Sequence, residues 1–173
     1  MNDFNNIDFS EELKNFKKDK EPEAIKVLYI DDEVNNLSGF KANFRRDFDV
    51  YTAPSTAEAR KIMEKTNIHI IISDQRMPDE TGVQFFNSIK EQYPDPIRIL
   101  LTGYADIEAV IGAINKGQVY RYITKPWDEN ELKITLKNAF EVFALREENK
   151  ELMKSLIQSN KQLEFMLRQR LLS

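Results

Sequence analysis

Five residues that could do chemistry stand at or just after the ends of apolar runs of the sequence: Asp31, Asp32, Asp74, Thr102 and Lys125. Carboxylates placed side by side repel one another and raise their own pKa values unless a cation neutralises them. Oxygen ligands suit Mg²⁺ far better than zinc, and the sequence has no cysteine and a single histidine. With a hard cation screening it, an aspartate can attack a phosphoryl donor and become an aspartyl phosphate.

The threonine and the lysine fit the same chemistry. The Lys125 ammonium could pair with phosphoryl oxygens, and the Thr102 hydroxyl could hydrogen-bond to another. Each residue alone also has an ordinary explanation: a turn residue for Asp31 or Asp74, a hydroxyl at a strand end for Thr102, and a solvated charge for Lys125. Their joint occurrence at the ends of four apolar runs favours one shared site.

The elements that must position these residues follow from the apolar pattern. β-branched runs at 25–30, 50–52, 68–74, 97–101 and 119–123 predict five buried strands. Helical patterns predict helices through Leu37 and Phe44, from Ser55, over 82–93, over 106–115 and from Asp128. This alternation predicts an α/β fold, an open parallel sheet with helices on both faces. The carboxyl ends of its strands lie along one edge, where ligands bind.

The residues stand in motifs that resemble a two-component response-regulator receiver domain, over about residues 25 to 140. The motifs are Val27-Leu28-Tyr29-Ile30-Asp31-Asp32-Glu33, Ser73-Asp74-Gln75-Arg76-Met77-Pro78 with Gly82, Leu101-Thr102-Gly103-Tyr104, and Tyr122-Ile123-Thr124-Lys125-Pro126-Trp127. The resemblance implies a flavodoxin-like sheet with strand order 2-1-3-4-5. It also implies a signalling switch that is not itself an enzyme and that accepts a phosphoryl group from a histidine kinase.

The resemblance implies roles for individual residues. Asp74 would be the phosphoacceptor, with Mg²⁺ held by Asp32, Asp74 and the backbone carbonyl of Arg76, and with Asp31 acting largely through water. Thr102 and Tyr122 would be the switch hydroxyl and the switch aromatic. Arg76 and Tyr104 match positions that tune the lifetime of the phosphoryl group, and the Lys125-Pro126 bond matches one that is usually cis.

Composition limits the other functions that the chain could have. Its 173 residues are 41% hydrophobic, which is enough for a real core. The 25 basic and 29 acidic residues give a net charge of −4, so we expect no binding to nucleic acid or acidic membranes. The sequence has neither a signal-peptide profile nor an apolar run that could span a bilayer, and we expect a cytoplasmic protein.

The sequence divides into three parts. Residues 1–24 form a polar arm with a possible short helix from Ser10, either disordered or docked on the domain or on a second subunit. Residues 25–140 form the receiver-like domain, in which the single histidine, His69, is expected to be a packed side chain rather than a ligand. Residues 141–173 continue the last helix without a Pro or a Gly.

The heptad pattern of the C-terminal part predicts a coiled coil. Written as heptads, its a positions are Val142, Asn149, Leu156 and Leu163, and its d positions are Leu145, Leu152, Ser159 and Met166. Asn149 at an a position favours a parallel dimer in register, whereas Ser159 weakens the lower part of the seam. We therefore expect a parallel homodimer. A single solvated helix is the alternative, which would leave these apolar side chains exposed.

Two questions stay open at this point. Either the chain is truncated before an output domain, which we favour, or the coiled coil is itself the output. The helical extension is similar to that of receivers that precede His-Asp-type cyclic-di-GMP phosphodiesterases or serine phosphatases. A haloacid-dehalogenase-like phosphatase is an alternative function of a different class. Such a phosphatase would have an Asp-x-Asp motif where this chain has Asp31-Asp32-Glu33. An unphosphorylated scaffold receiver is disfavoured because all five site residues are present.

Overall fold

The computed structural model describes residues 23–172. The predicted N-terminal arm therefore lies almost wholly outside the described residues, and so does the side chain of Tyr104.

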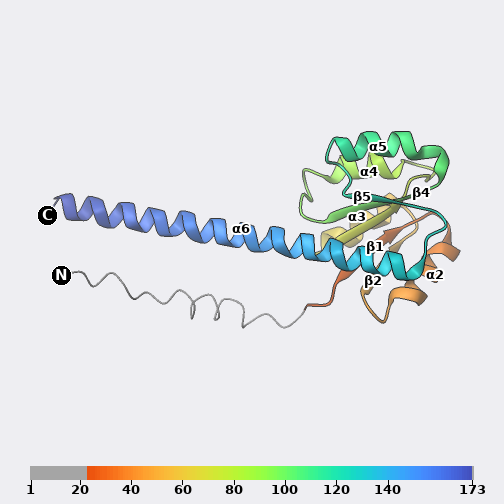
Figure 1. Cartoon of the computed structure of the whole chain (residues 1–173), viewed down its shortest axis with the longest axis horizontal. Coiled ribbons are helices and arrows are strands. Elements are labelled where there is room, and N and C mark those ends of the chain that lie inside the picture. The colour runs from red at the N-terminus through yellow and green to blue at the C-terminus, as the bar shows by residue number, and fades with distance from the viewer. Residues whose placement is uncertain (1–22, 173) are drawn as a thin grey trace.

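A single sheet of five parallel strands forms the centre of the domain, in the order β2-β1-β3-β4-β5 (Figure 1). This is the predicted flavodoxin-like order. The strands are β1 (Lys26–Ile30), β2 (Asp49–Ala53), β3 (Ile70–Asp74), β4 (Ile97–Thr102) and β5 (Arg121–Thr124). β3 is buried along its whole length, which explains its almost continuous isoleucine run.

Helices cover both faces of the sheet, as the sequence pattern predicts. The helical elements are α2 (Val34–Phe44), α3 (Thr56–Lys65), α4 (Gly82–Ile89), the short 3₁₀ helix η1 (Tyr104–Asp106), α5 (Ile107–Asn115) and α6 (Glu129–Leu172). The core on one face joins side chains of α2 and α6 to Val27, Ile70 and Ile72. The core on the other face joins α3, α4 and α5 to Leu28 and Ile71. Successive strand residues thus alternate between the two cores.

Element boundaries differ from the sequence prediction by a few residues. The helix predicted over 82–93 ends at Ile89 and is followed by a turn in which the Tyr93 N–H donates to the Ile89 carbonyl oxygen, just before Pro94. The last strand begins at Arg121 rather than Val119. The helix predicted from residue 106 begins at Ile107, after the 3₁₀ turn of η1.

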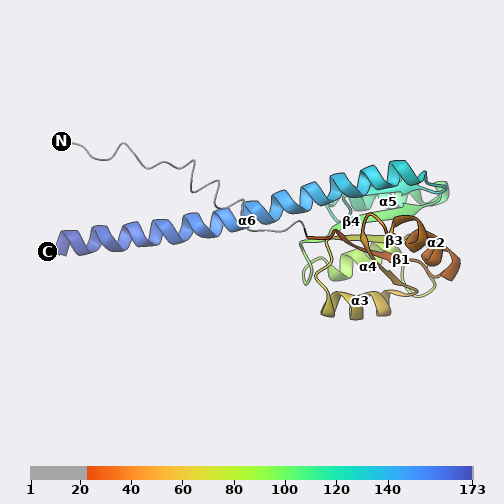
Figure 2. The same cartoon turned by 90° about the horizontal axis from the view of Figure 1, so that it is seen from below.

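The last helix, α6, is a single element of 44 residues (Figures 1 and 2). Its first part covers the sheet with Leu132, Leu136, Ala139 and Phe143. From Glu148 to Leu172 every side chain is exposed, and Lys150 makes an ion pair with Asp95 at the base of the domain. Among the described helices, none combines the length and the apolar character needed to cross a membrane.

Candidate functional site

Three carboxylates converge at the carboxyl edge of the two central strands. β1 and β3 pair with Ile30 opposite Ser73, so the residues that come next, Asp31 and Asp74, lie side by side. Asp32 joins them, and one oxygen from each of the three side chains lies within 4.8 Å of the others. Asp31 and Asp74 are buried, whereas Asp32 is exposed to solvent. The structure thus brings together all three predicted acidic residues.

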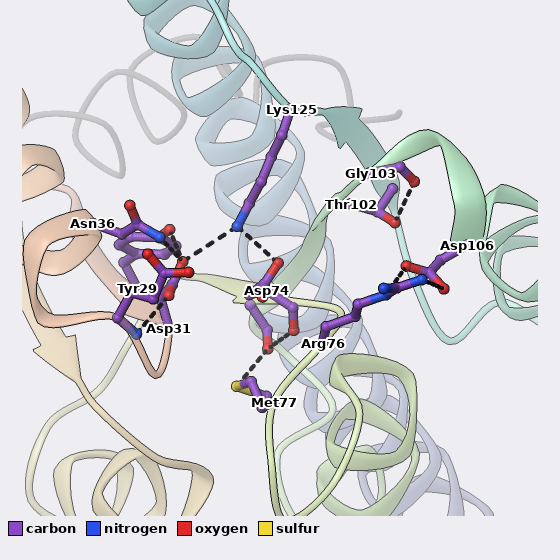
Figure 3. Close-up of polar contacts among 12 residues, drawn as sticks. Tyr29, Asp31, Asn36, Asp74, Arg76, Met77, Thr102, Gly103, Asp106 and Lys125 are labelled. Atoms are coloured by element: carbon purple, nitrogen blue, oxygen red, sulfur yellow. Dashed lines mark hydrogen bonds and ion pairs between the residues drawn. The ribbon is translucent and has the colours of Figure 1, made fainter.

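Lys125 supplies a positive charge at the centre of this group (Figure 3). Its Nζ lies 2.9 Å from Oδ1 of Asp74 and 3.4 Å from Oδ2 of Asp31. The backbone at Lys125 is held in place because its N–H donates to the carbonyl oxygen of Thr102 at 2.9 Å. The Lys125-Pro126 peptide bond is cis, as the resemblance implies.

Asp31 is fixed by a set of donors that the sequence reading missed. The Tyr29 hydroxyl donates to its Oδ2 at 2.5 Å, and the Asn36 amide donates to the same oxygen at 3.0 Å. The backbone N–H of Glu33 donates to Oδ1 at 2.9 Å. Burial, followed by the hydrogen bond to Asp31, raises the pKa of Tyr29, so this hydroxyl stays a donor. The sequence did contain a signal for the Tyr29–Asp31 hydrogen bond, because residues two apart along a strand lie on the same face of the sheet.

The electrostatics of Asp74 and Lys125 are coupled. Burial raises the pKa of Asp74, and the hydrogen bond and charge of Lys125 offset this only in part. Burial also lowers the pKa of Lys125, but the hydrogen bonds and charges of Asp74 and Asp31 more than offset it, so the net pKa is raised. Lys125 therefore stays protonated. It holds Asp74 in a fixed orientation close to a second carboxylate.

The donor set fits a magnesium ion. The three carboxylates offer oxygen ligands only, which is the preference of a hard cation that keeps some of its water. Exposure of Asp32 leaves room for such water. The described residues place no sulfur or imidazole ligand within this acidic group.

The side chains of the two predicted switch residues, Thr102 on β4 and Tyr122 on β5, make no hydrogen bond to Asp74 in the described structure. Thr102 is fully buried, and its hydroxyl donates to the carbonyl oxygen of Gly103 at 3.1 Å, so it faces its own loop (Figure 3). Tyr122 is half-buried and packs against the core under α3, α4 and α5. It lies opposite Leu100 in the register of β4 and β5.

Arg76 makes a contact that the sequence reading did not predict. Its Nε lies 2.7 Å from Oδ2 of Asp106, and its Nη2 lies 3.3 Å from Oδ1 (Figure 3). No sequence signal pointed to this pair, because its members are separated by β4 and approach only when the loops after β3 and β4 are folded.

Gly82 lets α4 start directly against the site. A Cβ at this position would lie 2.6 Å from the carbonyl oxygen of Asp74 and 2.5 Å from Cδ2 of Leu100. Thr81 caps the helix through a capping box with Gln84. The site and the first turn of α4 are therefore in direct contact through the backbone.

Comparison with known proteins agrees with this geometry. The response regulator receiver domain model matches residues 27–137. The chain is 38% identical over 122 residues to the hydrogenase transcriptional regulatory protein HoxA of Bradyrhizobium diazoefficiens. The matched region covers 70% of this chain and 25% of that protein. The chain thus spans about a quarter of the length of this relative.

Solved structures lead to the same family. The signal receiver domain of an HD domain-containing protein from Pseudomonas fluorescens Pf-5 is 28% identical with a TM-score of 0.69, covering 75% of this chain and 96% of that one. The beryllofluoride-activated NtrC4 receiver domain dimer is 34% identical with a TM-score of 0.63, covering 68% of this chain and 98% of that one. Taken with the sheet order and the acidic site, these matches show that the chain belongs to the response regulator receiver domain family.

Proposed function

We propose that this chain is a phosphorylation-dependent switch that accepts a phosphoryl group on Asp74 from a histidine kinase. The observation that carries the proposal is the position of Asp74, held at 2.9 Å by the Lys125 ammonium beside two further carboxylates. Family membership supports it, since phosphorylation and Mg²⁺ are typical of receiver domains.

In the proposed reaction an oxygen of Asp74 forms a bond to phosphorus while the P–N bond of a phosphohistidine donor breaks. The imidazole keeps the electron pair of that bond and then takes a proton. Lys125 holds Asp74 in orientation and can pair with a phosphoryl oxygen as negative charge shifts onto it.

Asp32, Asp74 and the backbone carbonyl of Arg76 would hold Mg²⁺, with Asp31 acting largely through water. The ion would supply charge neutralisation between the carboxylates and the incoming phosphoryl oxygens. The hydrogen bonds from Tyr29, Asn36 and Glu33 fix Asp31, which suits an acceptor that positions water rather than a mobile ligand.

Phosphorylation adds a charge of about −1.5 to −2 at Asp74 together with new acceptor oxygens. These would draw the Thr102 hydroxyl away from Gly103 and leave space behind it for Tyr122 to turn inward. The surface of α5, β5 and the first part of α6 would then change. The two arrangements pre-exist, and the phosphoryl group biases them through its different contacts in each.

We further propose that α6 carries the change to a second copy of the chain or to an output domain. Residues 25–140 act as the receiver and residues 141–173 as a parallel coiled coil. The supporting observation is a row of exposed apolar side chains at the predicted a and d positions, among them Leu152, Leu156 and Leu163. The NtrC4 receiver relative is a dimer.

The output itself differs among relatives. One is named a transcriptional regulatory protein and another belongs to an HD domain-containing protein. For this chain alone, its net negative charge still argues against contact with nucleic acid.

The test is phosphorylation of the whole chain by acetyl phosphate and Mg²⁺, followed by intact mass. We expect one phosphoryl group per chain, its loss in Asp74→Asn, and no reaction in EDTA. Asp47→Asn is the matched control, because Asp47 also pairs with a lysine, Lys133, away from the site. Catalytic turnover of a small phosphate ester would instead favour the dehalogenase-like phosphatase, and a chain that stays unlabelled would favour the scaffold receiver.

A further inference from the structure

The Arg76–Asp106 ion pair joins the two segments that flank the proposed phosphorylation site. Arg76 is two residues beyond Asp74, and Asp106 is the last residue of η1, four residues beyond Thr102. Both contacts of the pair are made by the fork of the guanidinium, at 2.7 and 3.3 Å from the two carboxylate oxygens. The loop after β3 is thereby tied to the loop after β4.

The guanidinium is free to change partners. The side chain of Arg76 is 72% exposed, so no packing locks it in place. The hydrogen bond and charge of Asp106 raise the pKa of Arg76, and the charge of Asp74 adds to the effect. Figure 3 shows the guanidinium directed toward Asp106.

Through Asp106, the Arg76–Asp106 ion pair also lies close in sequence to Thr102. The hydroxyl of Thr102 donates to Gly103, which lies in the segment between Thr102 and the anchored Asp106. The Asp106 N–H also donates to the Gly103 carbonyl oxygen at 3.3 Å, so the Arg76–Asp106 pair is connected to the oxygen that accepts the Thr102 hydrogen bond.

We propose that Asp106 is a resting-state partner that withholds the Arg76 guanidinium from Asp74, and that a phosphoryl group on Asp74 draws Arg76 across and releases the segment after Thr102. The inference rests on the proposed function of Asp74. Arginine binds phosphate oxygens in the same two-pronged way as a carboxylate, and the phosphoryl group carries more charge than Asp106. The two partners thus compete for one cation.

This competition predicts whether each substitution raises or lowers the affinity for beryllofluoride. Asp106→Asn frees Arg76, so beryllofluoride with Mg²⁺, which mimics the phosphoryl group, should bind about threefold more tightly, a size set by an exposed ion pair. Arg76→Gln should weaken binding. In the Arg76→Gln background, Asp106→Asn should cause no further change in affinity. With Arg76 present, Asp106→Glu keeps the carboxylate and should keep the wild-type affinity.

The measurement is a titration of the full chain with beryllofluoride at saturating Mg²⁺, followed by the fluorescence of Trp127, the single tryptophan. Glu80→Gln is the matched control, because it breaks the Arg60–Glu80 pair, whose carboxylate is as exposed as that of Asp106. Far-ultraviolet circular dichroism verifies that each variant is folded. High salt should shrink the effect of Asp106→Asn.

The outcomes separate the two proposals. Unchanged or weaker binding in Asp106→Asn, or an equal gain in the presence and absence of Arg76, would overturn the competition while the role of Asp74 stands. A wild-type chain that binds no beryllofluoride would overturn the proposed function and, with it, this inference.

Discussion

The ammonium of Lys125 lies 2.9 Å from Oδ1 of Asp74, although Asp74 ends β3 and Lys125 follows β5, and β4 lies between these two strands. The long lysine side chain crosses the end of β4 and also comes within 3.4 Å of Asp31. One ammonium at the edge of the sheet thus pairs with two carboxylates at its centre. Removal of the Lys125 ammonium should lower the stability of the protein most when no metal ion is present.

Lys125→Met should lower the free energy of unfolding in EDTA by about 1–2 kcal/mol, because it leaves two buried carboxylates without their cation. Added Mg²⁺ should restore more stability to this variant than to the wild type. Urea unfolding in EDTA and in Mg²⁺ measures both effects. Lys133→Met is the control: Lys133 pairs with Asp47 at similar exposure, so its loss should cost under about 1 kcal/mol. Equal Mg²⁺ responses in both variants would contradict the prediction.

Gly82→Ala should cost about 1–3 kcal/mol of stability and weaken beryllofluoride binding. The new Cβ would meet the carbonyl oxygen of Asp74 at 2.6 Å, so either the end of β3 or the start of α4 must shift. Gly112→Ala is the comparison, since a Cβ there meets nothing within 4 Å. Inside α5 it should stabilise the protein by up to about 1 kcal/mol. Two alanines that change stability in the same direction would count against this account.

The single histidine should make stability depend on pH. His69 is buried, accepts a hydrogen bond from the Lys26 N–H through Nδ1, and packs on the rings of Phe140 and Phe143. Burial lowers the pKa of His69, opposed by the carboxylate of Glu23 and assisted by Lys26. The prediction of a packed histidine agrees with this position.

Because the folded-state pKa of His69 is depressed, its contribution to stability is present above its unfolded-state pKa, about 6.5, and is lost as the pH falls through the folded-state pKa. His69→Gln can still accept the Lys26 hydrogen bond but does not titrate. The loss of stability between about pH 7.5 and about pH 5.5, measured by urea unfolding, should therefore be smaller in the variant. A loss of the same size in both proteins would remove His69 as its source.

Leu156→Glu should convert a dimer into a monomer. Leu156 is 57% exposed on α6 at a predicted a position, where a charge would be buried against the second helix. We expect the dimer dissociation constant to rise by at least about tenfold, measured by sedimentation equilibrium. Gln158→Glu adds the same charge at an outward position and should leave the constant unchanged. A wild-type chain that is monomeric throughout would rule out the coiled coil.

Most of the fold and the acidic centre of the site could be predicted from the sequence. Buried parallel strands have a continuous apolar pattern, and a strand end is a fixed place in space once the sheet order is known. Asp31, Asp74 and Lys125 each stand at such an end, so their meeting followed from the topology. The assignment of Asp74 as phosphoacceptor stays a prediction until it is labelled.

Contacts made by loops and by long flexible side chains could not be predicted. The Arg76–Asp106 pair depends on two loop conformations and on the path of an exposed guanidinium. The Lys150–Asp95 contact likewise depends on the angle at which α6 leaves the domain. Sequence patterns report periodic burial, and neither pair is periodic or buried.

The length of α6 turns small rotations into large displacements. About 22 residues beyond Lys150 extend for roughly 33 Å, at 1.5 Å per residue. As a lever pivoting near the Lys150–Asp95 contact, this rod would carry its far end about 6 Å sideways for a tilt of about 10°. A small tilt of α6 where it packs on the sheet thus becomes, at Leu172, a displacement larger than the width of a side chain.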